Sequence, residues 1–172
     1  EFSEYDKKWL IDDFQHNQII LVNGDFITSN FSFENKNKIK IKKLKIIKLH
    51  TGNIMYILKK QELKKWNFKE AYFSKVKFGK IKAWKYHKKM TLNLVVPSGR
   101  VKFVFYFPKE QRFKAVEIGE KKYARLTVPP KIWFGFKGMK KPESIILNLV
   151  NFNHSQKEIL RKNKNKIKFN WK

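Results

Sequence analysis

The sequence predicts an all-β domain of the barrel or sandwich type. Large apolar residues recur with a period of two, as at Val101, Phe103 and Phe105, and this alternation is typical of strands that bury one face. Turn residues such as Gly79 and Gly119 separate the apolar runs at short intervals. Strands that follow one another through short turns, without intervening long helices, predict a barrel or a sandwich rather than a parallel α/β fold.

The N-terminal part of the chain predicts a β-hairpin. Residues 18–22 are apolar and partly β-branched, Asn23-Gly24 follows, and residues 25–28 resume an extended pattern. Asn-Gly between two such runs is a strong hairpin signal, because a tight primed turn needs positive φ at both central residues. The polar, Asn-rich residues 30–38 indicate a linker, so we assign residues 1–43 to an appendage with a hairpin and a linker.

The main domain is predicted to span residues 44–172, a length that suffices for one well-packed core. A first alternating strand is expected at 39–42, just before it. The further strands are expected at 54–58, 71–78, 81–87, 92–96, 101–107, 113–118, 123–128, 145–152 and 166–171. Two short helices are expected at 59–66 and 156–162.

The chain is strongly basic, with 40 Lys and Arg residues against 14 Asp and Glu and a formal net charge of +26. Such a charge attracts polyanions, because basic side chains displace counterions from phosphates. Only four of the 40 are Arg, the residue that binds phosphate in a planar, bidentate way. Abundant Lys, Asn, Ile and Phe beside four Ala indicate an AT-rich coding sequence. We therefore attribute most of the charge to genome composition, and the remainder favours an anionic small molecule as ligand.

Several classes of chemistry are excluded by what the sequence lacks. It has no cysteine, which removes disulfides, thiolate zinc sites and thiol nucleophiles. Its four histidines have neither the H-x-H nor the H-E-x-x-H spacing that places two imidazoles on one metal, and no phosphate-binding glycine loop is present. We therefore predict no metal and no cofactor. Apolar runs stay below the roughly 18 residues of a membrane helix, so a cytoplasmic protein without a membrane span is expected.

Reactive side chains are densest on the predicted strand at 81–87. Alternation places Lys85 and His87 on one face of that strand. Trp84 and Tyr86 lie on the other. If the first face lines a cavity, His87 titrates near neutrality, and crowding by other cations gives Lys85 a lowered pKa suited to a base. In the alternative interpretation these side chains reach solvent, as most lysines do.

Two blocks of the sequence match the motifs of one enzyme family. Residues 70–99 contain KAWKYHKKMT, which fits a strand pattern K-x-W-x-x-H-x-x-M-T. Residues 125–136 contain VPPKIWFGF, which is similar to the pattern I-P-P-G-x-x-H-G-F. Residues 145–153 and 167–171 are similar to the closing strands of the same family. Over about residues 44–172 the chain thus resembles the dTDP-4-dehydrorhamnose 3,5-epimerase family.

The resemblance implies a fold, a reaction and partners. The family has a cupin-type jelly roll, commonly as an intertwined homodimer, with a sugar nucleotide entering the open end of the barrel. Its reaction removes protons beside a 4-keto group and returns them on the opposite face, with a His base, a Tyr acid and no metal. The resemblance therefore predicts a cupin-type jelly-roll barrel, and a sugar-nucleotide 3,5-epimerase-like function on a 4-keto-deoxysugar nucleotide in surface-polysaccharide biosynthesis.

Two other functions fit parts of the same sequence. A non-catalytic cupin would hold a nucleotide sugar or a glycan without turning it over. Nucleic acid ranks last, although aromatic residues interleaved with lysines are typical of single-strand binders. Phe103, Phe105 and Phe107 alternate strictly with their neighbours, as core residues do.

The chain departs from the family at the positions that carry the chemistry. In a direct alignment the family's base His falls on Lys85, and His87 is the nearby imidazole. The His of the second block falls on Phe134, and the Tyr acid falls on Leu147. The family's acidic partner near the C-terminus has no counterpart in this alignment. The resemblance therefore predicts the fold of this chain more firmly than its activity.

From these observations we predict a set of site residues. The catalytic candidates are His87 and Lys85, with three tyrosines as further proton-transfer candidates, namely Tyr86, Tyr106 and Tyr123. The expected substrate-binding residues are Lys82, Trp84, Asn93 and Arg125.

Overall fold

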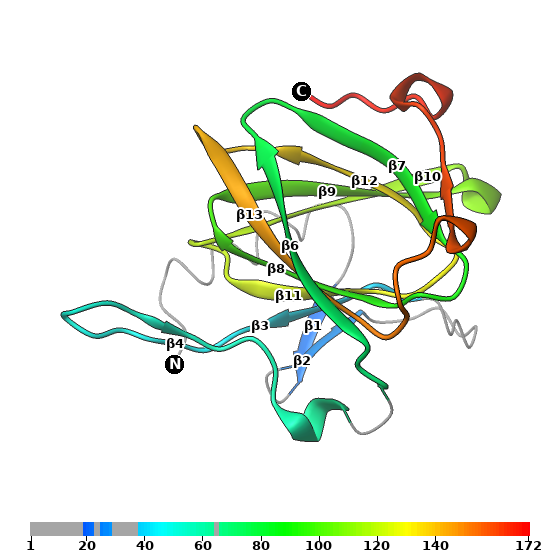
Figure 1. Cartoon of the computed structure of the whole chain (residues 1–172). Helices are drawn as coiled ribbons and strands as arrows, with labels where there is room; N and C mark the ends of the chain where they lie inside the picture. Colours follow the sequence, from blue (N-terminus) through cyan, green and yellow to red (C-terminus); the bar gives the residue numbers. More distant parts are fainter. Residues whose placement is uncertain (1–18, 23–24, 29–37, 64–65) are drawn as a thin grey trace. The chain divides into compact units, whose positions relative to one another are not determined.

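The computed structural model describes residues 19–22, 25–28, 38–63 and 66–172 (Figure 1). The chain divides into two compact units, Glu1–Asn35 and Lys36–Lys172. In the first unit, β1 (Ile19–Val22) pairs with β2 (Asp25–Thr28) in antiparallel register, as the hairpin prediction requires. The expected Asn23-Gly24 turn and almost all of the expected linker lie outside the described residues.

Two five-stranded antiparallel sheets face each other and form the barrel of the second unit (Figure 1). The first sheet has the order β10-β9-β12-β7-β14, with β7 (Ile81–His87), β9 (Arg100–Phe107), β10 (Arg112–Gly119), β12 (Trp133–Gly138) and β14 (Ile159–Arg161). The second has the order β3-β11-β8-β13-β6, with β3 (Lys40–Lys43), β6 (Glu70–Lys77), β8 (Leu92–Ser98), β11 (Ala124–Val128) and β13 (Glu143–Val150). The described residues contain only strands and short 3-10 helices, and none of these helices is long and apolar enough to cross a membrane.

The core lies between the inner faces of the two sheets. On β8, Leu92, Leu94 and Val96 are buried in this central cluster, because alternate residues of a strand point to the same side. Phe103 and Phe105 of β9 fill it from the opposite sheet and are fully buried. Each large apolar side chain taken from water stabilises the fold by about 1.5–3 kcal/mol.

The structure draws the domain boundary before β3, between Asn35 and Lys36, whereas the sequence places it between residues 43 and 44. β3 pairs with β11, with Ile41 opposite Leu126. Ile41 packs against the central cluster, and its neighbours on the strand are lysines. The alternating strand expected at 39–42 is thus β3, and its pairing with β11 assigns it to the barrel unit rather than to the appendage.

Three short segments differ from the secondary structure that the sequence predicts. The helix expected at 59–66 is a single 3-10 turn, η1 (Lys60–Leu63), among the described residues. The helix expected at 156–162 is a 3-10 turn, η3 (Gln156–Glu158), followed by β14, because β14 takes its hydrogen bonds from the edge of β7. The strand expected at 166–171 is not formed; η4 (Lys164–Lys166) precedes an irregular segment.

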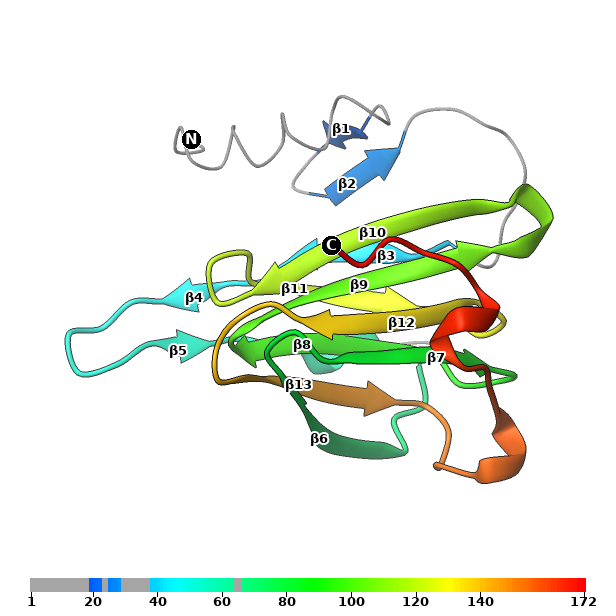
Figure 2. The same ribbon diagram turned by 90° about the horizontal axis from the view of Figure 1, so that it is seen from above.

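The C-terminal segment covers the outer face of the first sheet. In Figure 2 it runs, in red, along the outside of the sheet that contains β9, β12 and β7. Trp84 is fully buried beneath it, together with Val104, Trp133 and Ile167. The indole N–H of Trp84 donates to the carbonyl oxygens of Lys164 and Ile167, at 3.3 and 3.2 Å. This aromatic cluster therefore packs residues of β7 against residues that follow much later in the chain.

A second outer cluster lies on the other sheet. Val95, Tyr123 and Leu147 are buried there. They are covered by apolar residues before, within and after the two-stranded arm of β4 (Ile46–Ile47) and β5 (Ile54–Met55). The outer faces of both sheets are therefore partly packed.

Candidate active site

A small cavity lies inside the barrel, between the two sheets. Its volume is about 50 Å³, roughly that of one or two water molecules. The polar side chains that line it come from both sheets and from the segment after β13, and are Tyr72, Ser74, Lys82, Lys85, His87, Asn148 and His154. Three phenylalanines, Phe103, Phe134 and Phe136, close its apolar side. Titratable groups and aromatic rings thus converge on one enclosed space.

A β-bulge in β7 brings Lys82 onto the cavity face. Phe134 of β12 lies opposite Lys85, and Phe136 lies opposite Lys82, so β7 has one more residue than β12 over this stretch. Such an insertion changes the alternation of side chains. Lys82 is therefore in phase with Lys85 and His87, although strict alternation from His87 would turn it outward.

Gly135 lies between the two paired positions on β12 and accommodates this bulge. A Cβ at Gly135 would lie 2.7 Å from the Cβ of Ala83, closer than two carbon atoms can approach without a shift. The backbone approach of the two strands therefore requires glycine at this position. The glycine of the family's H-G-F pattern falls on this residue. The close approach of the two strands therefore explains why the second sequence block contains that glycine.

His87 and Glu158 form a buried pair at one side of the cavity. His87 Nδ1 lies 2.8 Å from Glu158 Oε2, and the two side chains are only 6% and 4% exposed. Glu158 Oε1 accepts the backbone N–H groups of Lys89 and Met90, at 2.8 and 2.9 Å. An ionised carboxylate only accepts hydrogen bonds, so Nδ1 of a neutral His87 carries the donated hydrogen and Nε2 keeps its lone pair. No residue in the described ranges forms a hydrogen bond with Nε2.

The environment of the pair favours a neutral imidazole beside an ionised carboxylate. Burial lowers the pKa of His87 below its ordinary 6.5, because desolvation of the imidazolium outweighs the hydrogen bond and charge of Glu158. Burial by itself would raise the pKa of Glu158, but the hydrogen bonds from Lys89, Met90 and His87 lower it below 4.5. At neutral pH His87 is therefore able to accept a proton at Nε2.

Lys85 and Tyr72 supply a cation and a proton donor. Burial lowers the pKa of Lys85, and the positive charges of Arg161 and Lys82 act in the same direction. Burial, together with the charges of Glu70 and Glu158, raises the pKa of Tyr72, so its phenol stays protonated. The cavity thus combines a base, a cation and an acid, which is the set that proton transfer beside a carbonyl requires. In the described residues, no group of three or more His, Asp or Glu side chains could hold a metal ion.

The structure brings together three of the six predicted site residues, Lys82, Lys85 and His87. Lys82 is exposed, and its Nζ donates to the carbonyl oxygen of Lys75 at 2.6 Å. Trp84 lies on the opposite face of β7, and its indole packs in a tilted arrangement against Trp171, with the ring centroids 5.3 Å apart. The prediction that Trp84 lines the barrel site does not agree with this position, because Trp84 supports the C-terminal segment.

Asn93 and Arg125 lie on the outer face of the second sheet, away from the barrel cavity. Asn93 Oδ1 accepts the hydroxyl of Thr127 at 2.5 Å. Arg125 donates to the carbonyl oxygen of Ile57 at 3.0 Å and to Glu62 Oε2 at 2.6 Å. These contacts fasten the segment after β5 to the barrel, so the prediction that both residues line the same site as His87 does not match the structure.

Sequence reasoning missed Glu158, the partner of His87, and four polar residues that line the cavity, which are Tyr72, Ser74, Asn148 and His154. The alignment found no counterpart of the family's acidic partner near the C-terminus, but the structure pairs Glu158 with the imidazole of His87. Leu147, where the alignment puts the family's Tyr, packs in the outer cluster with Val95. The three tyrosines held as further candidates also pack in the two outer clusters and are Tyr86, Tyr106 and Tyr123. Tyr72 could have been found from the period of two on β6, because it shares a face with the buried Val76.

Lys131 stands where the family pattern has its first glycine, and its backbone explains that glycine. Its φ is 68°, in the left-handed region that costs a residue with a Cβ roughly 1–2 kcal/mol. Its N–H donates to the carbonyl oxygen of His87 at 2.7 Å. This turn therefore fixes the end of β7, where the imidazole lies.

We expect Lys131→Gly to stabilise the protein by up to about 1 kcal/mol, because glycine relieves the left-handed strain but loses more backbone entropy on folding. The urea midpoint measures the change. The matched control is Lys121→Gly, at an exposed lysine outside the positive-φ set, where a loss of stability is expected. Equal effects of both substitutions would contradict the explanation.

No protein-family model matches the chain, and no curated protein sequence matches it. Solved structures do. A dTDP sugar isomerase from Desulfovibrio desulfuricans G20 superposes with a TM-score of 0.72 at 29% sequence identity, over 77% of this chain and 90% of that chain. A dTDP-4-dehydrorhamnose 3,5-epimerase from Sulfolobus tokodaii gives 0.67 at 22% identity, over 81% and 85%. QdtA, a sugar 3,4-ketoisomerase from Thermoanaerobacterium thermosaccharolyticum in complex with TDP, gives 0.63 at 20%, over 77% and 93%.

These matches are dTDP-sugar isomerases and a dTDP-4-dehydrorhamnose 3,5-epimerase. Among the described residues the fold is all-β, with two facing antiparallel sheets and a separate N-terminal hairpin. The resemblance to the dTDP-4-dehydrorhamnose 3,5-epimerase family is thereby confirmed, and the chain has the cupin-type jelly roll of that family's dTDP-sugar epimerases and isomerases.

Proposed function

We propose that this protein is a metal-independent epimerase or isomerase of a 4-keto-deoxysugar nucleotide. The observation that carries the proposal is the buried His87–Glu158 pair, with Lys85 beside it in the barrel cavity. The similarity to a dTDP sugar isomerase at 29% identity supports the substrate class. Surface-polysaccharide biosynthesis, a cytoplasmic location and a homodimer belong to the same proposal.

His87 acts as the base in this mechanism. Nε2 accepts the proton from the carbon beside the 4-keto group, and the electron pair of that C–H bond moves into the enolate. Glu158 holds the hydrogen on Nδ1 and stabilises the imidazolium that forms. A neutral imidazole at the pH of the cell is what the lowered pKa of His87 provides.

Lys85 and Tyr72 complete the proton transfer. The ammonium group of Lys85 stabilises the negative charge that develops on the enolate oxygen. The phenol of Tyr72 then donates its proton to the carbon from the opposite face. The imidazolium releases the first proton to solvent and the phenolate takes one proton from solvent, so both groups return to their starting forms. Both side chains line the same cavity as His87, and Tyr72 has a raised pKa that suits a donor.

The size of the cavity favours a second candidate function, a cupin that binds a nucleotide sugar or glycan without turnover. The space of about 50 Å³ is well below the roughly 300–1,000 Å³ of small-molecule pockets. Phe134, where the family has a histidine, stacks near His87 with the ring centroids 6.0 Å apart. Catalysis requires this cavity to widen until it admits a hexose ring, whereas a binding module could hold its ligand at the rim of the barrel.

Solvent deuterium separates the two functions. The protein is incubated in D2O with TDP-4-keto-6-deoxyglucose, and deuterium at C3 and C5 is followed by NMR. An enzyme incorporates deuterium faster than a sample without protein, because the base exchanges the abstracted proton with solvent. If exchange occurs at the rate of the protein-free sample while the ligand still binds, the result would favour the non-catalytic binding function over the enzyme. Exchange at only one of the two carbons identifies the stereocentre.

A further inference from the structure

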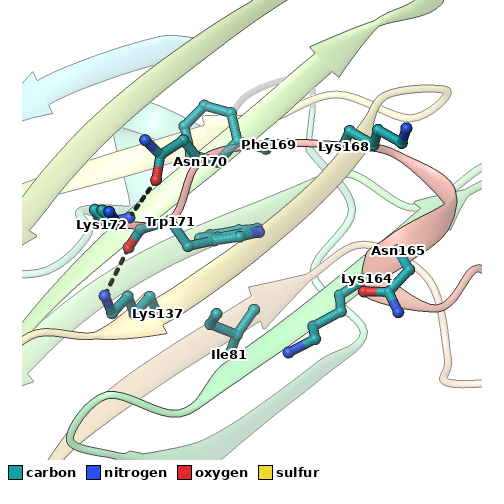
Figure 3. A pocket seen from close by; sticks show the side chains of 9 residues that line it. All are labelled: Ile81, Lys137, Lys164, Asn165, Lys168, Phe169, Asn170, Trp171 and Lys172. Atoms are coloured by element: carbon teal, nitrogen blue, oxygen red, sulfur yellow. Dashed lines mark hydrogen bonds between the residues drawn. The ribbon is translucent and has the colours of Figure 1, made fainter.

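A groove of about 670 Å³ lies on the outer face of the first sheet (Figure 3). Ile81 of β7 and Lys137 of β12 form one side, and residues 164–172 form the other. Ile81 and its neighbour Lys82 line different spaces, the groove and the barrel cavity. The two spaces are therefore separated by the thickness of the sheet. The volume of the groove falls within the roughly 300–1,000 Å³ of small-molecule sites.

All the charged side chains that line the groove are cationic. They are Lys137, Lys164, Lys168 and Lys172. Lys137 Nζ donates to the carbonyl oxygen of Trp171 at 2.6 Å. In the described part of the chain, the ammonium groups of Lys164 and Lys168 have no hydrogen-bond or ion-pair partner. Residues 159–172 contain six basic residues and no acidic one, so nothing in this segment neutralises the groove.

An aromatic ring forms the wall opposite Ile81. Figure 3 shows the indole of Trp171 facing Ile81, with Lys137 and Lys164 on either side of that residue. Trp84 and Phe169 hold the indole in place, with centroids 5.3 and 5.1 Å away. Its Nε1 is buried and has no acceptor among the described residues. The indole therefore presents its ring, and not its N–H group, to the groove.

We propose that this groove is a second binding site, separate from the barrel cavity, for a nucleoside diphosphate. The base stacks on the indole of Trp171, as bases do on aromatic side chains. The diphosphate lies between the ammonium groups of Lys164 and Lys168, which donate to its oxygens. A bare anion would not use the indole, and a volume of about 670 Å³ suits one nucleotide better than a polymer.

Equilibrium dialysis of the whole chain against labelled thymidine diphosphate tests the site. The double variant Lys164→Ala/Lys168→Ala is expected to lose one equivalent of bound nucleotide, with affinity at the groove about tenfold or more weaker. Lys82→Ala/Lys85→Ala, in the barrel, retains that equivalent. Lys109→Ala/Lys121→Ala removes the same charge at exposed positions elsewhere and is expected to bind as wild type. An unchanged groove double variant, or an equal loss in this control, overturns the proposal.

Trp171→Leu provides a second, independent measurement. Loss of base stacking is expected to weaken thymidine diphosphate by about 5- to 150-fold, while thermal unfolding shows that the variant is folded. Inorganic pyrophosphate that competes as well as thymidine diphosphate, or a thymidine dodecanucleotide that binds where thymidine diphosphate does not, contradicts a nucleotide site. None of these measurements reads proton exchange, so failure of the groove proposal leaves the proposed activity untouched.

Discussion

His87→Ala is expected to slow deuterium incorporation into TDP-4-keto-6-deoxyglucose by about 10²- to 10⁴-fold, the usual cost of losing a general base. Nucleotide binding should remain largely intact, because the imidazole acts on the reacting carbon. NMR of the deuterated sugar gives the rate, and calorimetry gives the affinity. The matched control is His50→Ala, at an exposed histidine, and it should exchange as wild type. Exchange that survives in His87→Ala would move the base to another residue.

Lys85→Ala and the double variant locate the proton-transfer group more closely. If both residues act on one proton, the double substitution costs little more than the worse single one. If their roles are independent, the two losses of rate add as free energies.

The pH profile gives a further check. Burial lowers the pKa of His87 below 6.5. When the pH is lowered past 6.5, the wild-type rate should therefore stay at its plateau, and it should fall only when the pH drops through the lowered pKa. A midpoint above 6.5 would contradict the neutral, desolvated imidazole.

Glu158→Gln is expected to lower the exchange rate by a similar factor through the tautomer of His87. The carboxylate accepts two backbone N–H groups at one oxygen and the imidazole at the other. An amide has only one oxygen, and if it serves the backbone, its NH₂ group faces Nδ1. The imidazole then carries its proton on Nε2 and cannot accept another. Nitrogen-15 NMR of His87 reads this change directly, and an unaltered tautomer would contradict it.

Glu158→Ala is expected to destabilise the fold, because each buried donor that is left without an acceptor costs about 1–3 kcal/mol. The imidazole and the two N–H groups lose their acceptor together. The lowered pKa of Glu158 adds stability that is present above pH 4.5 and is lost as pH falls through the lowered value. Urea unfolding should therefore show a weaker acid dependence in the variant. Glu110→Ala, at an exposed carboxylate, is the control. An equal loss of unfolding free energy in this control would contradict a structural role for Glu158.

The sequence predicted the strands of the barrel better than the faces of β7. The strand at 81–87 has the predicted bounds, because Gly79 and the polar residues after His87 end the apolar pattern on both sides. A bulge is a property of two paired strands, however, and single-strand alternation does not contain it. The resemblance placed Lys82 at the site, and the pairing of β12 explains how it reaches the cavity.

Other parts of the site depend on contacts between distant segments. Glu158 lies 71 residues from His87 in the chain, and a 3-10 turn that resembles a helix in sequence carries it. The alternation of Leu92 and Leu94 turns Asn93 outward, so the period of two on β8, if applied to this residue, would have excluded Asn93 from the barrel site. In the sequence Arg125 looks like any other strand residue. Its acceptors, Ile57 and Glu62, lie in the segment after β5 and come close to it only in the folded structure.

The position of the C-terminal segment also constrains how the molecule is made. Trp84 and its aromatic neighbours are covered by residues 162–171, which leave the ribosome after every strand of the two sheets. During synthesis the outer face of the first sheet is therefore bare, and contacts between such distant residues form slowly. A nascent chain that has already closed the barrel still exposes this aromatic surface, so chaperones would meet the protein there until the final segment emerges.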